Sequence, residues 1–144
     1  MSSLAGRTAL VTGGGTGLGA AISRRLHAEG VRVVVAGRRS DPLQRLADEL
    51  GNGIRAEVCH VADPDSVADL ARRLRGEQVS ILINNAGIAG PVAPLTEIDP
   101  DAWDEVFATN VRGTFLMCRA FLPAMIKRAA ETSSNWHRCP GSGR

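Results

Sequence analysis

The chain has 144 residues, 44% of them hydrophobic and 22% charged, with a formal net charge of only +2. This length suffices for one domain with an apolar core, and so mild a charge gives no reason to expect nucleic acid or a membrane surface as a partner. Aromatic residues make up 3%, which predicts an aliphatic core and excludes the stacking surfaces of single-strand-binding proteins. We find no apolar run of about 20 residues and no signal peptide at Met1–Leu4, and therefore expect a cytoplasmic protein.

Strand-like apolar runs alternate with helix-like segments, which is typical of a parallel sheet covered by helices. The expected strands are Thr8–Thr12, Arg32–Ala36, Ile54–His60 and Ser80–Asn84. The expected helices run from the glycine loop at residues 13–19 to near Gly30, from Pro42 to Leu50, from the Asp63–Pro64 cap through Leu74, and from Asp99 to about Lys127. Pro123 is expected to bend or end the last helix.

A glycine-rich loop directly follows the first strand. Residues 12–19 read Thr-Gly-Gly-Gly-Thr-Gly-Leu-Gly, and the apolar residues after them recur at helical spacing. Glycines allow a tight turn and a close approach to a ligand, while the free N–H groups at the start of the helix face an anion. With the second strand, the segment completes a βαβ unit. The pattern predicts a dinucleotide-binding α/β fold, a Rossmann-type doubly wound parallel sheet; the alternative is a tight turn without a ligand.

Two arginines follow the second strand, at the position where NAD-binding proteins carry an acidic residue that hydrogen-bonds the ribose 2′-OH. Here Gly37 is followed by Arg38 and Arg39. Guanidinium groups attract a 2′-phosphate, which a carboxylate would repel. This favours NADP(H) over NAD(H) as the cofactor, whereas the alternative interpretation is a solvated turn.

Asparagines mark two further positions. The segment Asn84-Asn85-Ala86-Gly87 follows the fourth strand, where loops of a parallel sheet line the ligand crevice. Its amides can tie neighbouring strands together, contact a cofactor or belong to a plain turn. Asn110 lies on the apolar stripe of the last helix and needs hydrogen-bond partners there, as either a satisfied core residue or a catalytic one. The three cysteines and three histidines lack metal-ligand spacing, so no metal site is expected.

The apolar surface of the last helix is broader than one sheet face requires, which leaves part of it for a contact with another subunit. A homo-oligomer formed through residues 101–127 is therefore one expectation. From Ala129 the apolar periodicity stops and Ser, Gly and polar residues dominate. We expect residues 1–128 to form the N-terminal, dinucleotide-binding part of a Rossmann domain and residues 129–144 to be an unstructured tail.

Together and in this order, these motifs resemble the short-chain dehydrogenase/reductase family in its single-domain form. The likeness runs from about Leu4 to Lys127 and rests on Thr12-Gly13-x-x-x-Gly17-x-Gly19, on Asn84-Asn85-Ala86-Gly87, and on Asn110 within residues 109–113. The resemblance implies hydride transfer between a nicotinamide cofactor and an alcohol or carbonyl carbon of a small molecule. The strand order expected is 3-2-1-4, with the fourth strand at an open edge.

The resemblance also assigns roles to individual residues. The glycine loop holds the cofactor pyrophosphate, the turn after the second strand reads the adenosine ribose, and the residues after the third strand hold the adenine. The loop after the fourth strand approaches the nicotinamide ribose, and Asn110 holds a water in a proton relay. His60 stands where the family commonly has Asp. The cofactor-binding candidates are Gly13, Gly14, Gly15, Thr16, Gly17, Leu18, Gly19, Arg38, Arg39, His60, Val61, Asn85, Ala86 and Gly87.

The remaining catalytic groups of that family have no counterpart in the sequence. In the family a Tyr acts as general acid/base, a Lys four residues later lowers its pKa, and a Ser orients the substrate oxygen. The chain contains no tyrosine, and its only lysine is Lys127. The resemblance therefore implies a chain truncated before this region and inactive as given. Two other interpretations stay open: a non-catalytic dinucleotide- or partner-binding module, and a truncated product without function.

Overall fold

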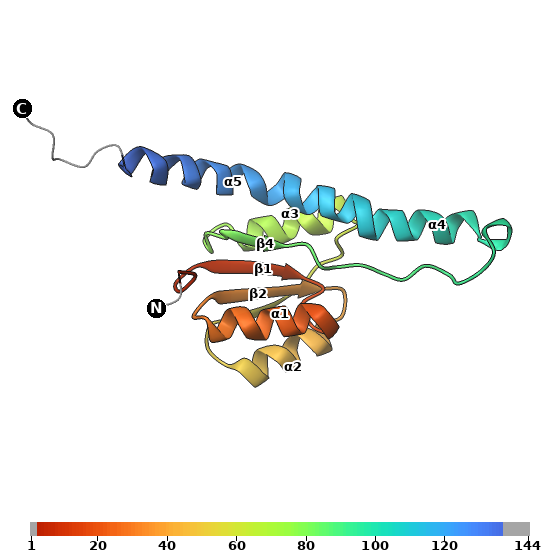
Figure 1. Ribbon diagram of the computed structural model, residues 1–144, viewed down its shortest axis with the longest axis horizontal. Coiled ribbons are helices and arrows are strands. Elements are labelled where there is room, and N and C mark those ends of the chain that lie inside the picture. Colours follow the sequence, from red (N-terminus) through yellow and green to blue (C-terminus); the bar gives the residue numbers. More distant parts are fainter. Residues whose placement is uncertain (1–2, 137–144) are drawn as a thin grey trace, which may run out of the picture.

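The computed structural model describes the backbone of residues 3–136 and the side chains of residues 3–131. Its centre is a four-stranded parallel sheet in the order β3-β2-β1-β4 (Figure 1). This order confirms the predicted Rossmann-type topology. The first strand has its predicted bounds, the second is one residue longer, and the third and fourth are shorter than predicted. The strands are β1 (Thr8–Thr12), β2 (Arg32–Gly37), β3 (Ile54–Val58) and β4 (Ile81–Ile83).

Helices cover both faces of the sheet (Figure 1). One face carries α1 (Gly17–Ala28) and α2 (Ser40–Leu50), and the other carries α3 (Pro64–Arg73) and α5 (Gly113–Trp136). No helix within residues 3–136 is long and apolar enough to cross a membrane. The other elements are a 3-10 turn η1 (Leu95–Glu97), the helix α4 (Pro100–Phe107) and a π-helical turn η2 (Ala108–Arg112).

Alternate residues of the two central strands belong to two separate apolar cores, one on each face of the sheet. This burial on both faces explains the unbroken apolar runs of β1 and β2, because neither face of a doubly covered strand meets water. The core shared with α1 and α2 contains Ala9, Val11, Val33 and Val35. The core shared with α3 and α5 contains Leu10, Val34 and Ala36.

Two helices begin where their capping residues predict. The Asp63 carboxylate accepts the N–H of Asp65 at the start of α3, and the Asp99 carboxylate accepts the N–H of Asp101 at the start of α4. In both helices Pro occupies the first turn, where its missing N–H removes no helical hydrogen bond.

The segment after Asp99 differs from the predicted single helix. It consists of α4, the π-helical turn η2 and α5, and α5 passes through Pro123 and continues to Trp136. The predicted helix end near Lys127 and the predicted lack of structure over residues 129–136 are therefore wrong. Ala129 and Ala130 favour a helix, and a helix that extends past the sheet needs no apolar stripe (Figure 1). The remainder of the predicted tail, residues 137–144, lies outside the described residues.

Candidate cofactor site

The loop between β1 and α1 leaves the start of α1 open to a ligand. Thr16 is the N-cap residue but makes no side-chain cap hydrogen bond, and the first turn of α1 contains no acidic side chain. The first N–H groups of a helix have no partners within the helix and carry partial positive charge. Together with the preceding glycines, this terminus is suited to a phosphate group.

Two glycines determine the shape of this loop. Gly13 has a φ of +62°, in the left-handed region that side chains disfavour. A Cβ atom at Gly19 would lie 2.1 Å from the Gly13 carbonyl oxygen and 2.5 Å from the amide nitrogen of Asn85. The helix α1 therefore packs directly on the glycine loop and on the loop after β4, and no side chain fits between them.

Hydrogen bonds of Thr12 and Asn85 join the carboxyl ends of β1 and β4. The Thr12 hydroxyl accepts the N–H groups of Asn85 and Ala86 at 3.1 and 3.0 Å. The Asn85 side-chain amide donates to the carbonyl oxygens of Thr12 and Gly13 at 3.2 and 3.1 Å. Of the alternatives open for this asparagine, the structure shows that its side chain ties neighbouring strands. The glycine loop and the loop after β4 thus form one connected rim.

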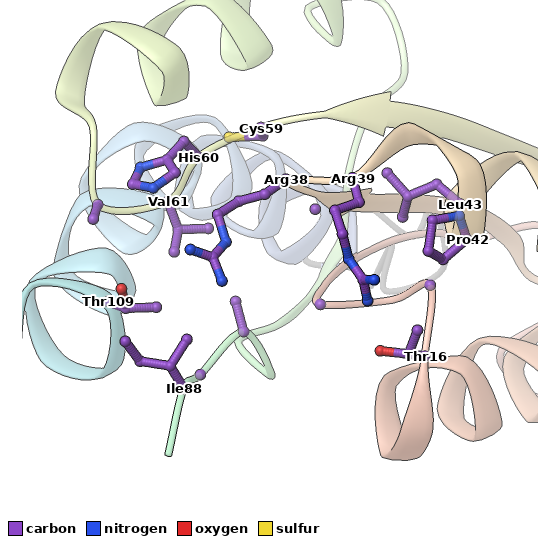
Figure 2. Close-up of a pocket in the computed structure, with 16 residues that line it drawn as sticks. Thr16, Arg38, Arg39, Pro42, Leu43, Cys59, His60, Val61, Ile88 and Thr109 are labelled. Atoms are coloured by element: carbon purple, nitrogen blue, oxygen red, sulfur yellow. The ribbon is translucent and has the colours of Figure 1, made fainter. Parts of the chain in front are cut away.

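A pocket opens over the carboxyl ends of the strands (Figure 2). Its wall comes from the glycine loop, the turn after β2, the segment after β3, the loop after β4 and the turn η2. This edge of an open parallel sheet is where doubly wound folds bind their ligands. The lining residues are Gly13, Gly15, Thr16, Gly37, Arg38, Arg39, Pro42, Leu43, Cys59, His60, Val61, Ala62, Ala86, Gly87, Ile88 and Thr109.

The polar part of this pocket is basic. Figure 2 shows Arg38 and Arg39 from the turn after β2, and His60 from the segment after β3, around the pocket. None of the lining residues is acidic. Within the described side chains, no carboxylate forms a salt bridge with Arg38 or Arg39. The pocket therefore presents two guanidinium groups without a counter-charge, an arrangement suited to a phosphate group.

The turn η2 closes the pocket on the side of α4 and α5. Thr109 is buried in the pocket wall, and the Asn110 side chain bonds to the main chain of Ile88 in the loop after β4. Asn110 is exposed rather than a core residue, and the hydrogen-bonding groups of its amide meet the backbone. The main-chain carbonyl of Asn110 accepts the Thr114 hydroxyl at 3.5 Å.

The structure brings most of the predicted cofactor residues to one pocket. Those that line it are Gly13, Gly15, Thr16, Arg38, Arg39, His60, Val61, Ala86 and Gly87. The other candidates are not among the residues that line it: Gly14, Gly17, Leu18, Gly19 and Asn85. Leu18, for example, is 70% exposed.

Sequence reasoning missed several lining residues. Gly37, Cys59 and Ala62 adjoin strand ends, so their position at the carboxyl edge was a usable signal. Pro42 and Leu43 line the pocket from the first turn of α2, and Ile88 and Thr109 are placed by the tie between η2 and the loop after β4. The sequence motifs did not single out these four as site residues.

A parallel α/β sheet with a glycine loop after β1 and a basic crevice at its carboxyl edge defines a dinucleotide-binding class of domain. Within that class, the chain belongs to the short chain dehydrogenase family, whose sequence profile matches residues 7–132. This confirms the resemblance noted from the motifs.

Individual relatives cover nearly all of this chain. It is 36% identical over 142 residues to an NADP-dependent 3-hydroxy acid dehydrogenase of Shigella flexneri, covering 92% of this chain and 57% of the relative. A solved 3-ketoacyl-(acyl-carrier-protein) reductase of Brucella melitensis, complexed with NADH, matches with a TM-score of 0.85 and 32% identity, covering 90% of this chain and 55% of that one. A metagenomic short-chain oxidoreductase in complex with NADP matches with a TM-score of 0.83 and 36% identity, covering 88% and 60%. The chain thus spans little more than half the length of these relatives.

Proposed function

We propose that this chain is the NADP(H)-binding part of an oxidoreductase that transfers a hydride between the cofactor and an alcohol/carbonyl pair. The observation that carries the proposal is the pair Arg38 and Arg39, which line a pocket whose lining residues include no carboxylate. The names of the relatives support the class of cofactor, since one is called NADP-dependent and the solved structures hold NADP or NADH. The preference for the 2′-phosphate rests on the arginines.

The order of the strands supports a separate loop for each part of the dinucleotide. The pyrophosphate belongs at the start of α1, which follows β1 in the middle of the sheet. On one side, Arg38 and Arg39 after β2 suit the 2′-phosphate, and His60 and Val61 after β3 suit the adenine. On the other side, the Asn85–Gly87 loop after β4 suits the nicotinamide ribose.

When bound, the nicotinamide ring supplies or accepts the hydride. The residues of this chain bind and orient the cofactor, and Asn110 takes part in moving the proton. The family resemblance implies that Asn110 holds the water of a proton relay. Because its amide is held by Ile88, we assign this water to the second lone pair of its main-chain carbonyl, which also accepts the Thr114 hydroxyl. A π-helical turn displaces carbonyl groups from regular helical pairing, and such turns are frequent at functional sites.

The 144-residue chain by itself is proposed to bind the cofactor without turning over a substrate. It contains no tyrosine, and its one lysine, Lys127, is exposed on α5 and does not line the pocket. A proton relay without a general acid lacks the group that donates to the carbonyl oxygen. NADPH oxidation in the presence of a panel of ketones tests this, with the chain purified from a host that lacks other dehydrogenases. Turnover by the chain would contradict the proposal.

The proposed cofactor preference is tested by replacing Arg38 with Asp. We expect Arg38→Asp to weaken NADPH binding by about 10- to 100-fold, the loss of a charge-assisted hydrogen bond, and to leave NADH binding within about twofold. Arg45→Asp is the matched control, because Arg45 is an exposed arginine on α2 that does not line the pocket. Calorimetric titration of each variant gives the two dissociation constants. An equal loss for both cofactors, or no loss for either, would defeat the assignment.

A further inference from the structure

The turn η2 contacts loops at opposite ends of the candidate cofactor pocket. Arg112 donates through Nη2 to the carbonyl oxygen of Ala62, in the segment after β3, at 2.7 Å. Asn110, two residues earlier, bonds to Ile88 in the loop after β4. Because β3 and β4 are the two outer strands of the sheet, this one turn is linked to both edges of the site.

Close packing accompanies the Arg112 contact. A Cβ atom at Gly113 would lie 2.7 Å from Cγ2 of Val61, so the start of α5 lies against the same segment without an intervening side chain. Val61 and Ala62 are both buried and both line the pocket. Figure 2 shows Thr109, from η2, on the wall that also carries Val61 and Ile88.

Apart from this packing, the other hydrogen bonds found for segment 60–62 among the described residues are local. Within its own region, the Asp63 N–H donates to the His60 carbonyl, and the His60 N–H donates to the Ser66 hydroxyl. Both partners belong to the start of α3, so they shape the segment without fixing it to the far side of the pocket. The Arg112 hydrogen bond, from a charged donor to a partly buried acceptor, provides that link.

We propose that Arg112 is a positioning residue for the adenine end of the cofactor site, holding the segment 60–62 at a fixed distance from the nicotinamide-side loop. Arg112 does not line the pocket and acts through Val61 and Ala62, which do. A loop that is ordered before the ligand arrives binds more tightly, because less conformational entropy is lost on binding. This inference rests on the proposed dinucleotide function.

The test compares Arg112→Met, Arg112→Lys and the control Arg119→Met, since Arg119 is an exposed arginine of α5 outside the pocket. The probe is adenosine 2′,5′-bisphosphate, titrated calorimetrically into the 144-residue chain. We expect Arg112→Met to bind the probe about tenfold more weakly. Arg112→Lys, which retains a charged donor, should recover most of this loss, and Arg119→Met should bind like the unaltered chain.

Hydrogen exchange provides a local readout that a general loss of stability would not reproduce. In Arg112→Met we expect faster exchange of the amides of residues 61–63 and unchanged exchange of the Ile88 amide, whose acceptor is Asn110. Probe binding by Arg112→Met within twofold of the unaltered chain would overturn the inference, as would an equal loss in Arg119→Met or no recovery with Lys. If the unaltered chain fails to bind the probe, the proposed function fails as well; if only the effect of Arg112 is missing, the proposed function stands.

Discussion

The side-chain amide of Asn110 and the main chain of Ile88 form two reciprocal hydrogen bonds. Ile88 N–H donates to Asn110 Oδ1 at 2.8 Å, and Asn110 Nδ2 donates to the Ile88 carbonyl at 2.9 Å. This pair fixes the loop after β4 to the turn η2, and therefore fixes one wall of the cofactor pocket to the start of α5.

Replacing Asn110 with Ala should destabilise the chain and weaken cofactor binding. Both backbone groups of Ile88 lose their partner, at a cost of about 1–3 kcal/mol in the free energy of unfolding. Urea denaturation measures this cost, and Asn52→Ala is the control, since Asn52 is exposed and its side chain makes no hydrogen bond among those found in the described residues. If Asn110→Ala is as stable as Asn52→Ala, the tie to Ile88 does not hold the loop.

Thr12→Val should weaken NADPH binding, whereas the same substitution at the other end of β1 should not. The substitution keeps the shape of a fully buried side chain but leaves the Asn85 and Ala86 N–H groups without their acceptor. We expect a loss of about 2 kcal/mol in the free energy of unfolding and weaker NADPH binding. Thr8→Val, at the other end of the strand, removes the acceptor of Arg32 and should leave NADPH affinity unchanged. Equal NADPH affinities of the two folded variants would argue against the role of Thr12 at the site.

Gly19→Ala should destabilise the chain far more than Gly76→Ala. The new methyl group would overlap the Gly13 carbonyl and the Asn85 amide, so we expect at least about 2 kcal/mol of destabilisation and loss of NADPH binding. At Gly76 nothing lies within 4 Å of the added Cβ, and Gly76→Ala should change stability by less than about 0.5 kcal/mol. Thermal unfolding of both variants with and without NADPH makes the comparison. A Gly19→Ala chain that binds NADPH normally would show that the loop tolerates a side chain.

Iodoacetamide should alkylate the buried Cys59 more slowly than the half-buried Cys118. Burial is the main cause that raises the pKa of its thiol, against the smaller opposing effect of the Ser66 hydroxyl. The folded state therefore holds the thiol proton more tightly than the unfolded chain does. The contribution of this thiol to the free energy of unfolding is fully present below the pKa that the thiol has in the unfolded chain. It is lost as the pH rises through the pKa of the thiol in the folded state. At pH 8 we expect iodoacetamide to modify Cys59 at least about tenfold more slowly than the half-buried Cys118. Peptide mass mapping over time measures both rates, and equal rates would contradict the burial of Cys59.

Much of the fold could be predicted from local sequence patterns. The parallel sheet follows from the alternation of strands and helices, its strand order from the family resemblance, and the bounds of β1 from the run that ends at Thr12. The glycine loop and the caps at Asp63 and Asp99 depend on neighbouring residues only, so a single sequence contains the information.

The parts that could not be predicted depend on contacts between distant residues. Asn110 and Ile88 are 22 positions apart, and no spacing rule marks the π-helical turn that brings them together. The length of α5 was underestimated because apolar periodicity reports burial, whereas the end of this helix depends on the helix propensity of residues such as Ala129. The role of Asn85 as a tie between strands likewise required the register of β1 against β4.

The most direct test of the account is thermal unfolding of the purified 144-residue chain during titration with NADPH and, separately, with NADH. A ligand that binds only the folded state raises the unfolding temperature, and at equal concentration the tighter ligand raises it more, as the logarithm of concentration over Kd. The account predicts one cooperative transition that NADPH raises more than NADH at the same concentration. A transition that neither cofactor shifts, or that NADH raises as much as NADPH, would contradict the claim that this chain forms an NADP(H) site around Arg38 and Arg39.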